Sequence, residues 1–184
     1  EGKNTVLVRH KAIPKFVERF KTMKDELKRR SSCKAEFFDI DTSKSGIESK
    51  EYTQRCRSFL YFTLGSIVAM MLKVPEVNFY ENGPISLNLP LSPQVIGGRA
   101  TRTTHPQTLY FFQELIQLIS GNPNFKVSNP FLDKTKADII RLIRDNGCGH
   151  LIKESMSCAH SWEQRLIHAH CGLCSQCVDR RVAI

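Results

Sequence analysis

The amino-acid sequence predicts an α/β fold, with a mainly parallel sheet flanked by helices and a cysteine-rich segment near the C-terminal end. Short apolar runs alternate along the chain with helix-length segments, and such alternation is typical of parallel sheets. The 184 residues are 41% hydrophobic, which is enough to bury a substantial core. The last four cysteines have the spacing of a metal knuckle, which predicts a small zinc-binding segment after the sheet.

Two strands and two helices are predicted in the first part of the chain. Residues 5–8 form an apolar run that predicts a buried strand, and residues 36–40 predict a second strand. Between them, over residues 15–30, apolar side chains recur every three or four positions, as in an amphipathic helix. A polar loop over residues 41–49 leads to a long helix over residues 50–73. The second half of that helix is apolar on nearly all sides, so we expect it to be well buried.

A third strand and a long irregular segment follow. Residues 77–80 predict the strand, and residues 81–84 predict a turn because they contain Asn-Gly and Gly-Pro pairs. Residues 85–104 show no steady period and are rich in proline, glycine and threonine. Long segments of this kind between regular elements are more often binding loops than filler. The next helix is expected to open at Pro106 and to end before Gly121.

The predicted sheet closes with a fourth strand over residues 125–128, which is followed by one more helix. We expect Asp133 to cap this helix and Gly147 to end it. Its predicted inward face is apolar and consists of Ala137, Ile139, Ile140 and Ile143.

The C-terminal segment contains four cysteines with metal-ligand spacing: Cys158, Cys171, Cys174 and Cys177. A Cys-x2-Cys turn directs two thiolates at one ion about 2.3 Å away, and the other ligands come from a neighbouring segment. This pattern predicts a structural Zn²⁺ site. An iron–sulfur cluster is the rival interpretation, although the ferredoxin pattern continues with x3-Cys-Pro, which is not found here. Four buried core cysteines fit poorly with a turn rich in Gly, Ser and Gln.

Charge and the other cysteines bear on partners and compartment. The net charge of +9 suits a polyanion such as nucleic acid, and equally a pocket for nucleotide phosphates. Cys33, Cys56 and Cys148 follow no pairing pattern, which favours a reducing, cytoplasmic compartment. The longest apolar stretch, residues 59–72, is too short to span a bilayer, so no membrane partner is expected.

Several of these features together resemble the 7-cyano-7-deazaguanine synthase (QueC-like) family. They are Glu81-Asn82 after a strand, Lys136 in Asp-Lys-Thr-Lys-Ala-Asp, Gly147-Cys-Gly149, and the four cysteines. The resemblance extends over roughly residues 5–181 and implies the fold of the adenine-nucleotide alpha-hydrolase-like ATPases, which is Rossmann-like. It also implies that the four cysteines hold a structural zinc.

Two stretches depart from that enzyme. Arg55-Cys-Arg57-Ser58 stands where the family has an Arg-Asn pair, and residues 81–90 and 101–106 look more like synthase-like proteins of bacterial anti-phage defence operons. The family's Ser-Gly-Gly-x-Asp-Ser loop, which binds nucleotide phosphates through backbone N–H groups, is missing from the sequence. We therefore expect a truncated chain that is inactive alone. Residues 1–150 would form an incomplete nucleotide-binding domain, and residues 151–184 the zinc segment.

The resemblance implies a reaction in which ATP with Mg²⁺ activates a carboxylate on a 7-deazaguanine-type molecule as an acyl-adenylate. A nitrogen nucleophile then displaces AMP. In the synthase the nucleophile is ammonia and the product is a nitrile, whereas in the defence branch it could be an amine on a partner protein. The residues expected to bind substrate or ATP are Arg57, Ser58, Glu81, Asn82, Thr101, Arg102, Thr103, Thr104, His105 and Lys136.

Plain structural alternatives stand beside these roles. Arg57 could be a surface charge, Glu81-Asn82-Gly83 only a turn, and His105 only a helix cap. Lys136 could be solvated, although a cation in the first turn of a helix opposes the helix dipole.

The whole chain also has two other interpretations. One is a non-catalytic zinc module that binds nucleic acid, although Leu173 is the only large apolar side chain between Cys171 and Cys177 where a base-stacking knuckle would carry aromatic residues. The other is a scaffold subunit whose partner carries the catalysis. The sequence also allows a homodimer.

Overall fold

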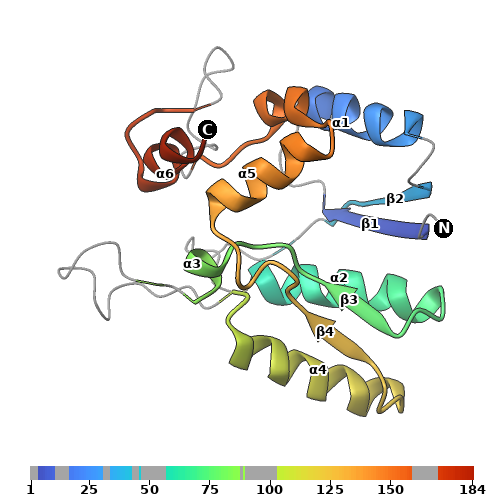
Figure 1. Cartoon of the computed structure of the whole chain (residues 1–184). Coiled ribbons are helices and arrows are strands. Elements are labelled where there is room, and N and C mark those ends of the chain that lie inside the picture. Colours follow the sequence, from blue (N-terminus) through green and yellow to red (C-terminus); the bar gives the residue numbers. More distant parts are fainter. Residues whose placement is uncertain are drawn as a thin grey trace. The chain divides into compact units, whose positions relative to one another are not determined.

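The computed structural model confirms an α/β fold with parallel strands and flanking helices (Figure 1). The chain divides into two compact units, one made of Glu1–Asp41 with Lys136–Ile184 and the other of Thr42–Thr135. Among the described residues, no helix is long and apolar enough to cross a membrane. The structure describes residues 4–10, 17–30, 34–42, 46, 57–87, 89, 103–158 and 170–184.

The first unit begins with a strand–helix–strand motif. Strand β1 (Asn4–His10) pairs in parallel with β2 (Lys34–Ile40), and helix α1 (Val17–Arg29) connects them. The ring of Phe20 on α1 packs edge-on against Phe37 on β2, with 6.3 Å between their centroids. Both strands and the helix match the predicted segments. The expectation that the first strand is buried is wrong, because its described side chains are only half-buried.

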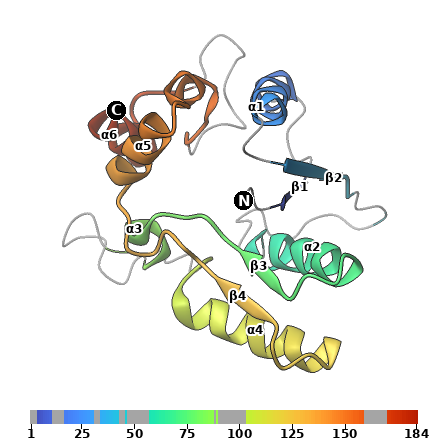
Figure 2. The ribbon, with the colours of Figure 1, turned by 45° about the vertical axis from the view of Figure 1, so that its right-hand side comes forward.

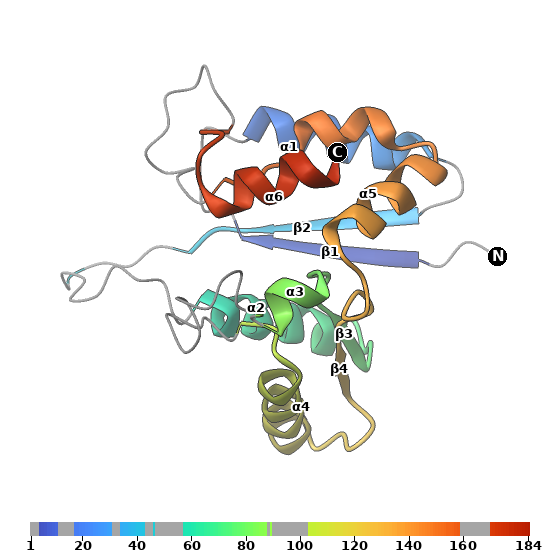
Figure 3. The same ribbon diagram turned by 60° about the vertical axis from the view of Figure 1, so that its left-hand side comes forward.

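Three helical segments complete this unit: α5 (Lys136–Asp145), the 3₁₀ helix η3 (Gly149–Glu154) and α6 (Ser175–Ala183). Helix α6 lies alongside α5 (Figure 3). Arg30, just after α1, donates hydrogen bonds of 2.8 and 2.7 Å to the carbonyl oxygens of Asn146 and Gly147. These bonds satisfy carbonyl groups that the end of α5 leaves without helical partners. Helix α5 begins at Lys136, later than the predicted cap at Asp133 requires.

The second unit is built around a short parallel pair of strands. Strand β3 (Glu76–Asn78) pairs with β4 (Lys126–Ser128), so that Val77 lies opposite Val127. Helix α2 (Arg57–Met71) packs beside β3, and helix α4 (Pro106–Ser120) packs beside β4 (Figure 2). The ring of Phe62 on α2 stacks on Phe112 of α4 with 4.4 Å between centroids. The buried core of the unit consists of Phe62, Ala69, Leu109, Ile116, Phe125 and Val127.

Two expectations for the second unit require correction. Helix α2 is not buried on all sides, because Ile67 and Met71 are 44% and 73% exposed. The predicted turn at residues 81–84 instead opens a short helix, α3 (Gly83–Ser86), which Asn82 caps by accepting a hydrogen bond from the N–H of Ile85. By contrast, α4 begins at Pro106 and ends before Gly121, whose φ of 66° is left-handed, as predicted. Most of the predicted binding loop, residues 88 and 90–102, lies outside the described residues.

Candidate functional site

The four predicted metal ligands converge in the first unit. The sulfur atoms of Cys158, Cys171, Cys174 and Cys177, here called the cysteine cluster, all lie within 4.8 Å of one another. Sulfur–sulfur distances of 3.8 Å between Cys171 and Cys177 and 4.0 Å between Cys174 and Cys158 are close to the edge of a zinc–thiolate tetrahedron, about 3.8 Å for bonds of about 2.3 Å. The cluster is therefore suited to Zn²⁺, as the spacing predicted.

The local backbone prepares the cluster for metal binding. The N–H of Cys174 donates a hydrogen bond of 3.3 Å to the sulfur of Cys171. This bond, together with one from the N–H of Leu173, lowers the pKa of Cys171, which favours the thiolate that a metal requires. Burial raises the pKa of Cys177 to about 11, so in the metal-free chain this thiol keeps its proton at neutral pH.

Helix α6 connects the cluster to the rest of its unit. It starts directly after Cys174 and includes Cys177. Its Arg180 donates hydrogen bonds of 2.8 Å to the Ser155 hydroxyl and 2.6 Å to the carbonyl oxygen of Ile152 in η3. The metal ligands are thus continuous with a helix that is fastened to its neighbours, which fits a structural role for the metal.

His170, directly before Cys171, is not among the residues whose ligand atoms converge in the cysteine cluster. Burial and the neighbouring Arg180 charge lower its pKa. The other two histidines of this region, His160 and His168, lie outside the described residues.

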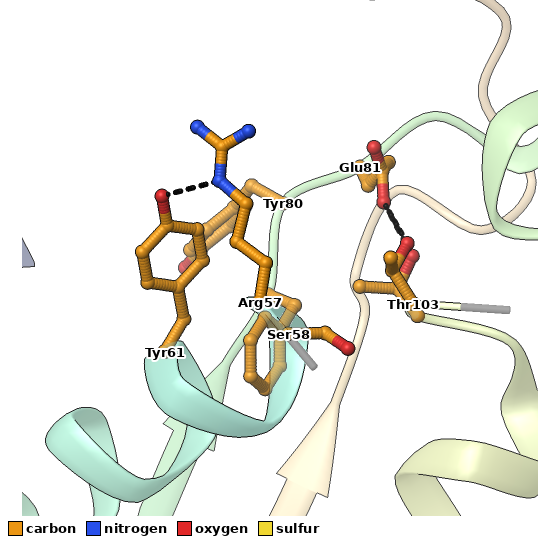
Figure 4. Close-up of a pocket in the computed structure, with 8 residues that line it drawn as sticks. Arg57, Ser58, Tyr61, Tyr80, Glu81 and Thr103 are labelled. Atoms are coloured by element: carbon orange, nitrogen blue, oxygen red, sulfur yellow. Dashed lines mark hydrogen bonds between the residues drawn. The ribbon is translucent and has the colours of Figure 1, made fainter. Parts of the chain in front are cut away.

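A second candidate site lies in the second unit. A pocket of about 340 Å³, here called the Glu81 pocket, opens beside the end of β3 and the first turn of α2 (Figure 4). Its lining comes from three separate stretches of the chain and consists of Arg57, Ser58, Tyr61, Phe79, Tyr80, Glu81, Thr103 and Thr104. Five of these residues, namely Arg57, Ser58, Glu81, Thr103 and Thr104, belong to the set that the sequence predicted for binding.

Two hydroxyl groups fix the Glu81 carboxylate. Its Oε2 accepts hydrogen bonds of 2.6 Å from Thr104 and 3.3 Å from Thr103. The Thr104 hydroxyl also lies 2.9 Å from the hydroxyl of Ser86, and both of these side chains are buried. In the described part of the chain, no hydrogen bond to the other carboxylate oxygen, Oε1, is found, so Oε1 can accept from a ligand.

Arg57 supplies the cation of the Glu81 pocket. Its Nε donates a hydrogen bond of 2.8 Å to the hydroxyl of Tyr61, one helical turn further along α2. Figure 4 shows this bond, with the guanidinium turned away from the carboxylate of Glu81. Guanidinium groups bind carboxylates and phosphates through two parallel N–H bonds, so this side chain can receive an anionic substituent.

The other predicted binding residues have different surroundings. Asn82 and His105 cap helices: the Asn82 side chain caps α3, and Nδ1 of His105 accepts a hydrogen bond of 3.2 Å from the N–H of Gln107. Lys136 lies in the first unit, where its ammonium forms a 2.6 Å ion pair with Asp179 and a 3.3 Å hydrogen bond with Gln176, both on α6. Thr101 and Arg102 lie outside the described residues.

Sequence reasoning missed the aromatic part of the Glu81 pocket. Tyr61, Phe79 and Tyr80 line it, and none of them was singled out beforehand. The available signals were the spacing of Tyr61, four residues after Arg57 on a helix, and the position of Tyr80 directly before Glu81. The edge-to-face contact of Tyr80 with Phe131, at 5.2 Å, joins residues far apart in sequence and had no such signal.

Comparison with known proteins finds a family model that matches the second part of the chain. No curated protein and no solved structure matches the sequence. The one matched segment is shorter than half of the chain; it contains Thr104, α4, β4, α5 and the whole cysteine cluster, but not Arg57 or Glu81. Residues 104–184 match the family model described as Queuosine biosynthesis protein QueC.

Proposed function

We propose that the chain carries the base-binding site of an ATP-dependent ligase of the QueC kind, and that the Glu81 pocket binds the base of a 7-deazaguanine-type carboxylate. The observation that carries this proposal is the convergence of Arg57, Glu81 and Thr104 from three distant segments on one pocket of about 340 Å³. Its volume lies in the range of about 300–1,000 Å³ that is usual for small-molecule sites. The QueC match over residues 104–184 supports the same substrate class.

The chemistry of the lining suits such a base. Tyr61, Phe79 and Tyr80 provide apolar ring surface for a planar heterocycle. The edge of a guanine-type ring carries N–H donors, which a carboxylate such as that of Glu81 accepts. An adenine-type edge presents an unprotonated ring nitrogen at the same position, which would face the carboxylate without a hydrogen bond. The Glu81 pocket should therefore prefer guanine-type bases.

Arg57 would bind the substrate's carboxylate or a phosphate of ATP. In the proposed reaction, a carboxylate oxygen attacks the α-phosphorus of ATP and pyrophosphate leaves, which gives an acyl-adenylate. A nitrogen nucleophile then attacks the acyl carbon, and AMP leaves with the bonding electron pair. A guanidinium near the reacting groups would offset the negative charge that builds up in these steps.

The proposal also covers the family branch, the cellular compartment, the nucleophile and the role of each part of the chain. The sequence features around Arg57 and residues 81–90 and 101–106 favour the anti-phage defence branch, in which the nucleophile would be an amine of a partner protein. The unpaired cysteines favour a cytoplasmic location. Residues 1–150 would contribute to nucleotide binding and residues 151–184 would hold Zn²⁺. Lys136, paired with Asp179, would support α6 rather than the Glu81 pocket.

Titration calorimetry with the whole chain tests the proposal. A 7-deazaguanine with a carboxylate at position 7 should bind, and the matching 7-deazaadenine should bind at least about tenfold more weakly because a buried hydrogen bond to a charged group is lost. Glu81→Gln should weaken the first ligand by a similar factor, whereas Glu114→Gln on α4, outside the lining, should not. Equal binding of both bases, or an unchanged affinity of Glu81→Gln, would refute the proposal.

A further inference from the structure

Asn129, the first residue after β4, joins the ends of the two strands through four hydrogen bonds. Its Oδ1 accepts from the N–H of Glu81 at 3.3 Å and from the N–H of Phe131 at 3.1 Å. Its Nδ2 donates to the carbonyl oxygen of Glu81 at 2.7 Å and to the hydroxyl of Ser86 at 2.8 Å. One amide side chain therefore holds the main chain of Glu81 by both its N–H and its C=O.

The orientation of this amide is fixed by its surroundings. Two backbone N–H groups face one side of Asn129, and a backbone carbonyl, which can only accept, faces the other. Swapping the oxygen and nitrogen would place like groups against each other in all three contacts. The amide is consequently a directional element that no hydroxyl or carboxylate of similar size can replace.

A series of hydrogen bonds leads from Asn129 through Ser86 and Thr104 to the carboxylate of Glu81. Nδ2 of Asn129 donates to the hydroxyl of Ser86, whose proton has two acceptors within reach: the hydroxyl of Thr104 at 2.9 Å and, farther away, the carbonyl oxygen of Glu81 at 3.4 Å. The Ser86 proton is therefore available for the shorter contact, to Thr104. The Thr104 proton in turn points at Oε2 of Glu81, 2.6 Å away. The Ser86 side chain is fully buried and Thr104 is 5% exposed, so water has little access to the bond between these two hydroxyls.

The segment that carries Asn129 is itself held in place. Phe131 packs edge-on against Tyr80, the residue before Glu81, and the N–H of Gly83 donates a 2.9 Å hydrogen bond to the carbonyl oxygen of Lys134. Residues 129–134 are thus docked along residues 80–83.

We propose that Asn129 is a positioning residue for the Glu81 pocket. It sets the Glu81 main chain directly and the Glu81 carboxylate through Ser86 and Thr104, so that Oε1 is presented to the N–H donors of a guanine-type base. This role rests on the proposed function, since it matters only if Glu81 binds the ligand. Asn129 itself does not line the pocket and acts through Glu81.

A double-mutant cycle with Asn129→Asp and Glu81→Gln tests this role. The aspartate keeps the acceptor side but has no donor for Glu81 or Ser86. In the otherwise unchanged chain, Asn129→Asp should weaken binding of the 7-deazaguanine carboxylate about tenfold. In the Glu81→Gln background it should add less than about twofold, because both changes remove the same contact. Asn124→Asp, which adds the same charge on an exposed turn, should leave the affinity unchanged.

The outcomes separate the two proposals. If Glu81→Gln has no effect, the proposed function fails and the role of Asn129 fails with it. If Glu81→Gln weakens binding but the effect of Asn129→Asp is absent or simply additive, only the positioning role is overturned. Should Asn129→Asp fail to fold, the same cycle with Ser86→Ala decides, since that variant interrupts the hydrogen bonds to Thr104 without adding charge. An additive Ser86→Ala effect would contradict the positioning role.

Discussion

The hydroxyl of Thr104 donates a 2.6 Å hydrogen bond to Oε2 of Glu81, a residue 23 positions earlier in the chain. This bond joins the end of β3 to the segment that enters α4. Thr104 is also the first residue of the segment that matches the QueC family model, whereas Glu81 precedes that segment. The contact therefore links the matched segment to the strand end that comes before it.

Replacing Thr104 with valine should weaken ligand binding by the Glu81 pocket about tenfold. Valine has a similar shape but removes the shorter of the two hydrogen bonds to the Glu81 carboxylate and the contact between Thr104 and the buried Ser86 hydroxyl. Thr103→Val removes only a 3.3 Å bond and should cost less. Calorimetric titration of the two variants side by side provides the measurement. A larger effect at Thr103 would contradict the geometry.

Gly83→Ala should destabilise the protein by about 2 kcal/mol or more. A Cβ atom at Gly83 would lie 2.1 Å from the backbone carbonyl oxygen of Leu132, which cannot move without shifting residues 129–134. Gly121→Ala is the matched control, because its Cβ would meet nothing within 4 Å and only the left-handed φ of 66° is penalised, by about 1 kcal/mol. Chemical denaturation measures both, and equal losses would show that the close approach at Gly83 is unimportant.

Removal of metal should loosen the C-terminal helix first. A Zn²⁺ held by the four thiolates would join Cys158 to α6, and its removal would leave the four sulfur atoms without the ion that favours their proximity. Hydrogen exchange at residues 175–184 should speed up after chelation and in Cys174→Ser. Cys148→Ser, which changes a free cysteine outside the cluster, should behave like the unaltered chain. Unchanged proteolysis and melting after thorough zinc removal would argue against this role.

Zinc affinity should rise with pH across the neutral range. Burial raises the pKa of Cys177 to about 11, so below that pH zinc must displace a proton from this thiol. Each displaced proton gives about a tenfold gain in apparent affinity per pH unit. Because the pKa of Cys171 is lowered, this thiol loses its proton more readily before zinc binds, so it contributes less to the pH dependence of zinc affinity. Competition titrations with a chelator at pH 6, 7 and 8 measure the slope, and a pH-independent affinity would contradict the assignment.

Much of the fold follows from local patterns. The position of α4 is set by Pro106, which lacks an N–H and suits a first turn, and by Gly121, which adopts the left-handed conformation without strain. The convergence of the four cysteines was predictable for a similar reason, since tetrahedral metal geometry restricts the spacing of the cysteines that can share one ion. In both cases the controlling interaction acts between near neighbours in sequence.

The features of the fold and of the candidate site that could not be predicted from the sequence depend on contacts between distant segments. Asn82, Gly83 and Pro84 favour a turn, but the same residue types also start helices, and docking of Gly83 against Leu132 and Lys134 accompanies the helical outcome. Lys136 was expected to bind substrate, yet its visible partner is Asp179, 43 positions later. The four bonds of Asn129 likewise have no local signature.

Chemical-shift mapping of the whole chain tests most directly whether the Glu81 pocket is the ligand site. On addition of the 7-deazaguanine carboxylate, the backbone amides of Tyr61, Tyr80, Glu81 and Thr103 should shift together, with a single saturation curve. The amides of α6 should not follow that curve. Shifts confined to the cysteine cluster and α6, or no saturable shift at Glu81 and its neighbours, would contradict the assignment.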